Sequence, residues 1–172
     1  MKTAFKYAAQ AAVLITVMLG LMWLLGGRTH STSATIRVDA KADKVFSFLL
    51  DPNLRRTWMS DVESIQSLNG LTDAVGASSE VRTVIDSKSV QVKEEIIELE
   101  PEQLLRVRSE IPWATWTTNF ALEANQSGTQ VHRRTYTRYR NLWRFWSLFL
   151  GDPIGDYQQN QLDSLRQAVD AP

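Results

Sequence analysis

The stretch WATWTTNFALEANQSGTQVHRRTYTRY, residues 113–139, decides the fold that we expect for this chain. Residues 113–123 and 129–139 have strand-like patterns, in which successive side chains point to opposite faces. Asn125-Gln126-Ser127-Gly128 between them has the composition of a tight turn. The stretch therefore predicts two long antiparallel strands joined as a hairpin.

The strand-like pattern extends upstream of this hairpin to Val62. It is interrupted only by short turn signals such as Asn69-Gly70, Asp86-Ser87 and Pro101. The additional strands are expected over residues 62–68, 78–85, 89–99 and 103–109. Short links between successive strands imply an antiparallel meander.

Helices are expected on both sides of this meander. A strand over residues 34–39 precedes a helix on which Val45, Phe48 and Leu49 fall at helical spacing, followed by a short helical turn over residues 54–59. Asp152-Pro153 has the composition of a helix start, and an apolar stripe continues to Val169. We therefore predict an α+β fold in which a curved antiparallel sheet wraps around a long C-terminal helix.

The N-terminal part has a different composition. Residues 1–7 are short and basic, and residues 8–27 read AAQAAVLITVMLGLMWLLGG, with Gln10 as the only strongly polar side chain. Twenty helical residues span about 30 Å, the thickness of a bilayer core. This predicts a transmembrane helix over 8–27, a linker over 28–33 and a domain over 34–172.

A cleaved signal peptide is the alternative, because the start is charged and small residues follow at Ser31 to Ala34. The length of the apolar run favours a retained anchor. Lys2 and Lys6 precede this run, whereas Arg28 follows it. This slight bias favours a cytoplasmic N-terminus and a domain on the outer, periplasmic side of a single-pass membrane protein.

Four short motifs occur in order along the domain: IRVDAKADKVF at 36–46, Asp51-Pro52 followed by RTWM at 56–59, EIIELEP at 95–101, and SGTQV at 127–131. Together they resemble the START-like, helix-grip superfamily, in the group of polyketide cyclases, dehydrases and lipid transport proteins (SRPBCC). The resemblance covers about residues 34–171. It implies an elongated apolar cavity between sheet and C-terminal helix, which holds lipids, sterols, isoprenoids or polyketides, and it implies no metal or redox cofactor.

Residues with obvious catalytic chemistry are few. The chain has no cysteine, and its histidines are His30 and His132, so a zinc site is not expected. Glu94 and three neighbouring glutamates are interpreted as a solvated strand. His132 is interpreted as a half-buried strand residue, with a general acid or base in a cavity as the alternative. The formal net charge is zero, which argues against a nucleic-acid partner.

Aromatic residues suggest the ligand-binding wall. Trp116, Thr118 and Phe120 share one strand face, which we expect to be the inner one. The predicted ligand-binding residues are Trp58, Trp116, Phe120, Tyr136 and Trp146. For each single ring the alternative is that it only fills the core.

Residues 124–151 contain no acid but five arginines, followed by an apolar and aromatic run. Arginine beside tryptophan is typical of a segment in a membrane interface. The predicted membrane-contact residues are Arg138, Arg140, Trp143, Arg144 and Phe149. Either this segment is buried against the sheet, or it forms a gate over the cavity that touches the bilayer.

These features predict a membrane-anchored binding module whose partners are a hydrophobic small molecule or lipid and the membrane. One alternative is an aromatase/cyclase-type enzyme that uses His132, Tyr136 or Arg134 on a polyketide-like substrate. Another is a tethered interaction domain without a cavity. A buried polar cluster would favour the enzyme, and a dry apolar tunnel the binder.

Overall fold

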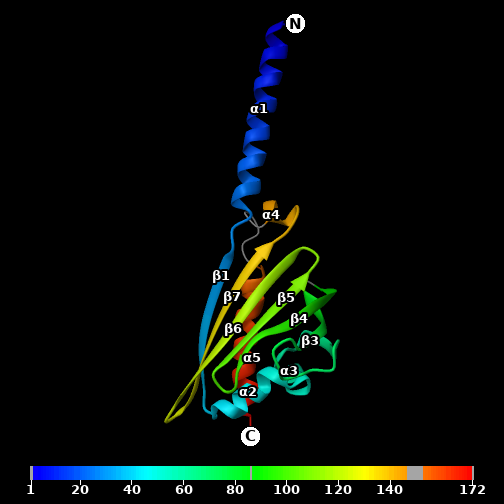
Figure 1. The fold of residues 1–172 in the computed structure, drawn as a ribbon. Helices are drawn as coiled ribbons and strands as arrows, with labels where there is room; N and C mark the ends of the chain where they lie inside the picture. The colour runs from blue at the N-terminus through cyan, green and yellow to red at the C-terminus, as the bar shows by residue number, and fades with distance from the viewer. Residues whose placement is uncertain (1, 86, 147–152, 172) are drawn as a thin grey trace.

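The structure is a computed structural model that describes residues 2–85, 87–146 and 153–171. One long helix precedes seven strands and four further helices (Figure 1). In chain order the elements are α1 (Lys2–Leu25), β1 (His30–Val38), α2 (Ala42–Leu50), α3 (Pro52–Trp58), β2 (Val62–Ser67), β3 (Ser78–Ile85), β4 (Lys88–Glu100), β5 (Leu104–Ile111), β6 (Ala114–Asn125), β7 (Gly128–Tyr139), α4 (Trp143–Trp146) and α5 (Pro153–Asp170).

The strands form one sheet in the order β1-β7-β6-β5-β4-β3-β2, and every neighbouring pair is antiparallel. The hairpin predicted from residues 113–139 is present as β6 and β7, paired from Ala114↔Tyr139 to Asn125↔Gly128. β1 closes the order by pairing with β7 rather than with its neighbour in sequence. The prediction of a curved antiparallel meander with a C-terminal helix is confirmed.

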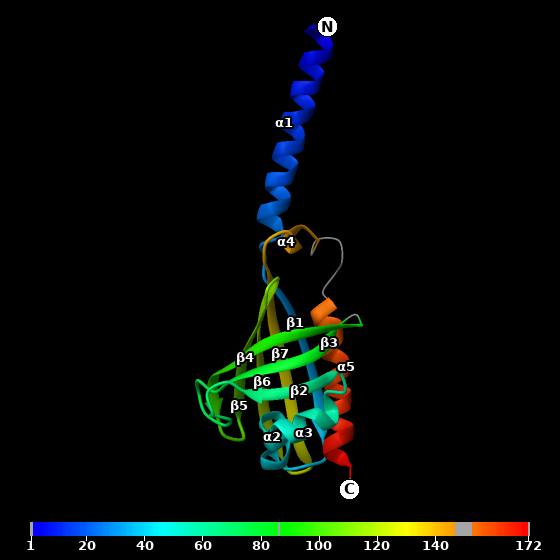
Figure 2. The ribbon, with the colours of Figure 1, turned by 90° about the vertical axis from the view of Figure 1, so that its right-hand side faces the viewer.

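α5 runs along the sheet, and α2 and α3 lie near its C-terminal end (Figure 2). The core between these elements joins Val38 and Val131 of the sheet, Val45 and Leu49 of α2, and Leu165 of α5. A second apolar cluster, built around Val62, Val81, Val92, Ile111, Ala114 and Tyr139, lies further along the sheet. The strand residues of both clusters come from one face of each strand, as period-two alternation requires.

β1 begins earlier than the sequence predicts. Residues 30–33, expected to be linker, are the first part of β1 and pair with β7 from His30↔Thr137 to Ser33↔Arg134. Their polar side chains hide this strand in the sequence, because backbone pairing with a long neighbour does not depend on an apolar pattern.

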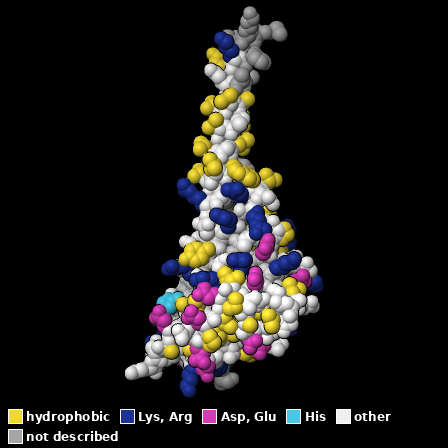
Figure 3. Space-filling model, viewed as in Figure 1, with side chains coloured by type: hydrophobic (Ala, Val, Ile, Leu, Met, Phe, Trp, Pro, Cys, Tyr) yellow, Lys and Arg dark blue, Asp and Glu magenta, His cyan; other side chains and the backbone are white. Residues whose placement is uncertain are grey.

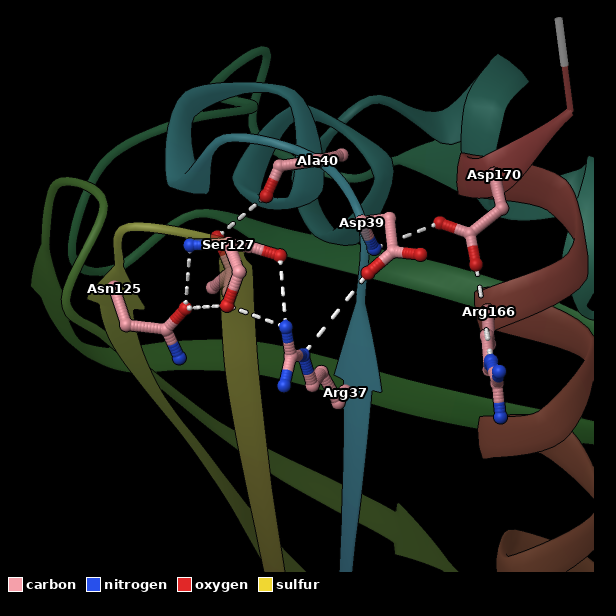
Figure 4. A network of polar contacts seen from close by, with 8 residues as sticks. Arg37, Asp39, Ala40, Asn125, Ser127, Arg166 and Asp170 are labelled. Atoms are coloured by element: carbon pink, nitrogen blue, oxygen red, sulfur yellow. Dashed lines mark hydrogen bonds and ion pairs between the residues drawn. The ribbon is translucent and has the colours of Figure 1, made fainter.

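The C-terminal end of α5 is attached to the end of β1 and lies near the β6–β7 turn (Figure 4). The Asp39 amide donates to Asp170 Oδ1 at 3.0 Å, and Lys44 Nζ donates to the Val169 carbonyl at 2.7 Å. At the turn, Gly128 has φ 132°, and a Cβ there would lie 2.2 Å from the Val38 carbonyl oxygen. Only glycine fits this close approach, so the turn predicted from sequence also fixes the position of β1.

α1 extends away from the domain, at the end opposite the C-terminus (Figure 1). Over residues 2–85, 87–146 and 153–171, we found no helix that is long and apolar enough to cross a membrane.

Candidate functional site

A cavity lies between the inner face of the sheet and helices α2, α3 and α5. The space open to the centres of water-sized molecules is about 80 Å³, several times the roughly 10–15 Å³ that one water needs. Most of its described lining is apolar and comes from both core clusters: Leu49, Trp58, Met59, Val62, Val81, Val92, Leu105, Val107, Trp116 and Phe120. The cavity is thus a gap between two halves of one apolar core.

Three of the five predicted ligand-binding residues line this cavity. Trp58 is buried at the end of α3, where its Nε1 donates to the Phe48 carbonyl at 2.9 Å. Trp116 and Phe120 lie on the inner face of β6 together with Thr118. Because the Nε1–H of Trp58 is already hydrogen-bonded, the rest of the indole ring forms an apolar part of the cavity wall.

Tyr136 is on the other face of the sheet. The buried residues of β7 are odd-numbered, from Thr129 to Tyr139, so Tyr136 points outward and is 38% exposed. Its assignment to the cavity wall is therefore corrected. The side chain of Trp146, the fifth predicted residue, lies outside the described part of the chain.

The same alternation corrects the residues named for an enzyme. His132 and Arg134 also occupy even-numbered positions of β7 and face outward. His132 Nδ1 is 3.0 Å from the Thr35 hydroxyl, and its Nε2 is 3.7 Å from Glu123, both at the surface. The side chains of His132, Arg134 and Tyr136 therefore do not line the cavity.

A buried arginine occupies the inner face of β7 instead. Arg133 is 8% exposed, and its guanidinium lies 5.2 Å from the centroid of the Phe120 ring. Both of its terminal nitrogens are 3.5 Å from Gln161 Oε1 on α5. These two residues form the polar end of the cavity.

A second polar pair lines the cavity at α3 and β4. Arg55 Nη2 lies 2.8 Å from Glu94 Oε2, and the two side chains are only 15% and 12% exposed. The expectation that Glu94 is a solvated strand residue is therefore corrected. The two charges compensate each other, which burial of an ion requires.

Three of the predicted membrane-contact residues come together beside α1. A hollow of about 470 Å³ is lined by Trp23, Gly27, Arg138, Tyr139, Arg140, Asn141 and Arg144. Arg144 lies 4.7 Å from the Trp23 ring centroid, and Arg140 pairs with Glu110 at 2.5 Å. The structure thus places cationic side chains around the C-terminal end of α1.

Trp143 lies next to this hollow, on α4. Its ring is 4.9 Å from that of Trp113, which stacks on Tyr139 at 6.3 Å. Trp143 nevertheless remains 43% exposed. Trp143 is thus in contact with residues of the sheet without being buried against it. Phe149 lies outside the described residues.

Sequence reasoning missed the polar lining residues Arg55, Glu94, Arg133 and Gln161. For Arg133 a signal existed, because Val131 and Arg133 share a strand face. For the Arg55–Glu94 pair no local signal exists, since the partners are 39 residues apart. Among the residues that the structure describes, no group of three or more histidine, aspartate or glutamate side chains could hold a metal ion.

Solved structures of similar fold support this description at low sequence identity. BexL, a di-domain ARO/CYC from the BE-7585A biosynthetic pathway, is 15% identical over 84% of this chain and 51% of that chain, with a TM-score of 0.67. Ara h 8.0201 is 14% identical over 83% and 96% (TM-score 0.65). TTHA0849 from Thermus thermophilus is 16% identical over 81% and 97% (TM-score 0.65). These identities establish a common fold and nothing further.

The family comparison covers most of the chain. No curated protein sequence was found to match it. The family described as polyketide cyclase / dehydrase and lipid transport matches residues 29–170, which comprise the whole sheet and α5. The chain therefore belongs to this family.

Proposed function

We propose that the protein is a binding module for a hydrophobic small molecule, a lipid or an isoprenoid, held in the cavity between sheet and α5. The observation that carries this proposal is the cavity lining, which is largely apolar and contains three aromatic side chains, Trp58, Trp116 and Phe120. Apolar walls with a few fixed polar groups are how proteins hold such ligands.

The proposal includes a membrane tether at α1. Its support is the sequence of residues 8–27 and the exposure of large apolar side chains on α1, among them Trp23 at 39% and Leu24 at 71%. A helix with such a surface needs an apolar environment. Lys2 and Lys6 before the apolar run give the N-terminus a cytoplasmic placement, with the domain on the outer side.

The surface around the end of α1 supports a second contact with the bilayer. Dark blue arginine and lysine side chains gather just below the apolar surface of α1 (Figure 3). Arg138, Arg140 and Arg144 border the hollow there, and basic residues are attracted to anionic headgroups. In the proposal this surface, with Trp143, holds the domain against the membrane and acts as the gate.

Native mass spectrometry of the full chain, released from its own type of cell and combined with organic extraction, tests the binding function. A stoichiometric lipid or isoprenoid in the complex is the expected result. An empty protein that also takes up no added lipid would contradict the proposal. Resistance of the full chain to extraction from membranes by alkaline carbonate tests the tether separately, and release by carbonate would contradict it.

A second candidate function is that of an aromatase/cyclase-type enzyme. The Arg55–Glu94 pair in the cavity lining favours it, because a part-buried carboxylate at a cavity is a candidate proton acceptor. The test is incubation with a thioester of a linear poly-β-ketone, with mass spectrometry to detect loss of water on ring formation. Turnover that Glu94→Gln abolishes would support the enzyme, and unchanged substrate would exclude it for this class.

A further inference from the structure

The orientation of the Gln161 amide is fixed by its neighbour. Gln161 Oε1 faces both terminal nitrogens of Arg133 at 3.5 Å. A guanidinium is only a donor, so the carbonyl oxygen of the amide must face it and the amide nitrogen must point the other way. Both residues line the cavity.

The amide nitrogen of Gln161 is buried without an acceptor. Gln161 is 5% exposed, and its Nε2 is buried with no hydrogen-bond partner in the structure. Buried donors in native proteins are nearly always satisfied. The hydroxyls of Thr118 and Thr135, on the inner faces of β6 and β7, already bond to each other at 3.2 Å. A bound molecule that carries a hydrogen-bond acceptor would therefore satisfy the amide nitrogen of Gln161.

The rest of the cavity is mainly apolar and suits the apolar part of such a molecule. The charge of Arg55 is compensated by Glu94 at 2.8 Å, so the pair presents no net charge. The remaining lining is mostly apolar, with Trp58, Val81 and Leu105 among its members, and includes the hydroxyls of Thr83 and Ser109. The cavity thus has a donor-rich end at Arg133 and Gln161 and a mainly apolar remainder.

We propose that the ligand is a monocarboxylate with an apolar chain, and that its carboxylate accepts hydrogen bonds from Gln161 Nε2 and from the Arg133 guanidinium. This inference rests on the proposed binding function and names the ligand class. A carboxylate supplies acceptors only, which matches the unpartnered Gln161 amide N–H and the guanidinium beside it. Hydrogen bonds to an ionised acceptor beside a guanidinium are also stronger than those to a neutral one.

The experiment compares dodecanoate with dodecanol, which has the same chain length and a neutral head. The full chain, kept in solution by an amphipathic polymer, is titrated with each probe. The wild-type protein is expected to bind dodecanoate roughly tenfold more tightly than dodecanol. In Gln161→Leu this preference should fall severalfold, while affinity for dodecanol stays the same. Gln167→Leu, on an exposed position of the same helix, is the matched control and should behave as wild type.

A second measurement distinguishes ligand contact from a purely structural role of Gln161. With dodecanoate labelled with carbon-13 at the carboxyl group, the bound NMR signal should remain that of the ionised form at pH values where free dodecanoate is protonated. Far-UV circular dichroism verifies the fold of each variant. Equal binding of both probes, or a preference that Gln161→Leu leaves intact, would overturn this inference alone. Absence of binding by either probe would overturn the proposed binding function with it.

Discussion

The guanidinium of Arg144 lies 4.7 Å from the centroid of the Trp23 ring, and this contact joins α4 to the last turn of α1. The backbone approaches closely at the same place. A Cβ at Gly26 would lie 1.8 Å from the Arg144 carbonyl oxygen, whereas a Cβ at Gly20 would meet nothing within 4 Å. The junction between α1 and the domain therefore depends on a glycine that follows the helix.

Gly26→Ala should loosen this junction, because the backbone of α4 must move to admit a methyl group. We expect faster proteolysis between α1 and β1 and altered tryptophan fluorescence from the Trp23 environment. Gly20→Ala is the control and should leave both properties unchanged. Identical proteolysis of the two variants would show that the α1–α4 contact does not order the junction.

The largely buried pair Arg55–Glu94 should contribute much more to stability than an exposed pair that also involves β4. Arg55→Met should lower the free energy of unfolding by about 3 kcal/mol, because it leaves the Glu94 carboxylate buried without its partner. Arg108→Met removes the partner of Glu95 in a pair whose side chains are about half exposed. This change should lower the free energy of unfolding by less than about 1 kcal/mol. Urea denaturation of both variants measures the difference. Similar losses would mean that Glu94 is solvated in solution.

Filling the cavity should reduce ligand binding without unfolding the domain. Ser109 is buried on the inner face of β5, and Thr117 of the adjacent strand β6 is on the outer face. Ser109→Phe should therefore reduce the amount of co-purified ligand at least roughly tenfold by occupying its space, whereas Thr117→Phe should retain it. Native mass spectrometry gives both amounts, with thermal unfolding as the check on folding. Full ligand occupancy in a folded Ser109→Phe protein would place the ligand elsewhere.

The attachment of α5 to the end of β1 should be measurable in the same way. Asp170→Ala removes the acceptor of the Asp39 amide and should lower the free energy of unfolding by about 1 kcal/mol. Asp163→Ala changes an exposed aspartate of the same helix and should have little effect. The midpoints of urea denaturation measure the stability of both variants. If the two variants unfold alike, the 3.0 Å contact to Asp39 does not hold the helix end.

The proposed contact with the bilayer can be tested by labelling, because the chain has no cysteine. Leu142, 69% exposed beside α4, is replaced by cysteine and labelled with a polarity-sensitive dye. In the full chain reconstituted into vesicles of anionic phospholipid, its emission should shift to shorter wavelengths. The control Leu71→Cys, in the β2–β3 connection, should show no shift. Equal emission from both sites would contradict a membrane contact at α4.

The strands and their turns can be predicted from sequence because the information is local. Asn125 to Gly128 and the alternation in β6 are contained in a few consecutive residues, and both predictions hold in the structure. Trp116 and Phe120 fall on the inner face for the same reason. The start of α5 at Pro153 likewise follows from the preceding Asp152 and from proline itself.

The inner face of β7 follows from the alternation of the whole strand and not from its aromatic residues taken singly. The buried, odd-numbered positions hold Val131 and Tyr139 beside Arg133, whereas Tyr136 shares the outer face with Arg134. Assigning Tyr136 to the cavity because of its ring chose the wrong parity, and a shift of one residue exchanges the whole face. The partners of Arg55 and Arg133 lie 39 and 28 residues away in the sequence, so these contacts could not be predicted from neighbouring residues.

The connection between α1 and β1 has a consequence for how a ligand would travel. Only residues 26–29 separate the two elements, and four residues reach at most about 14 Å. With α1 in a bilayer, the domain cannot leave that membrane's surface to visit another. The protein would therefore bind and release its ligand at a single membrane, within the length of this connection, and would not carry the ligand from one membrane to another.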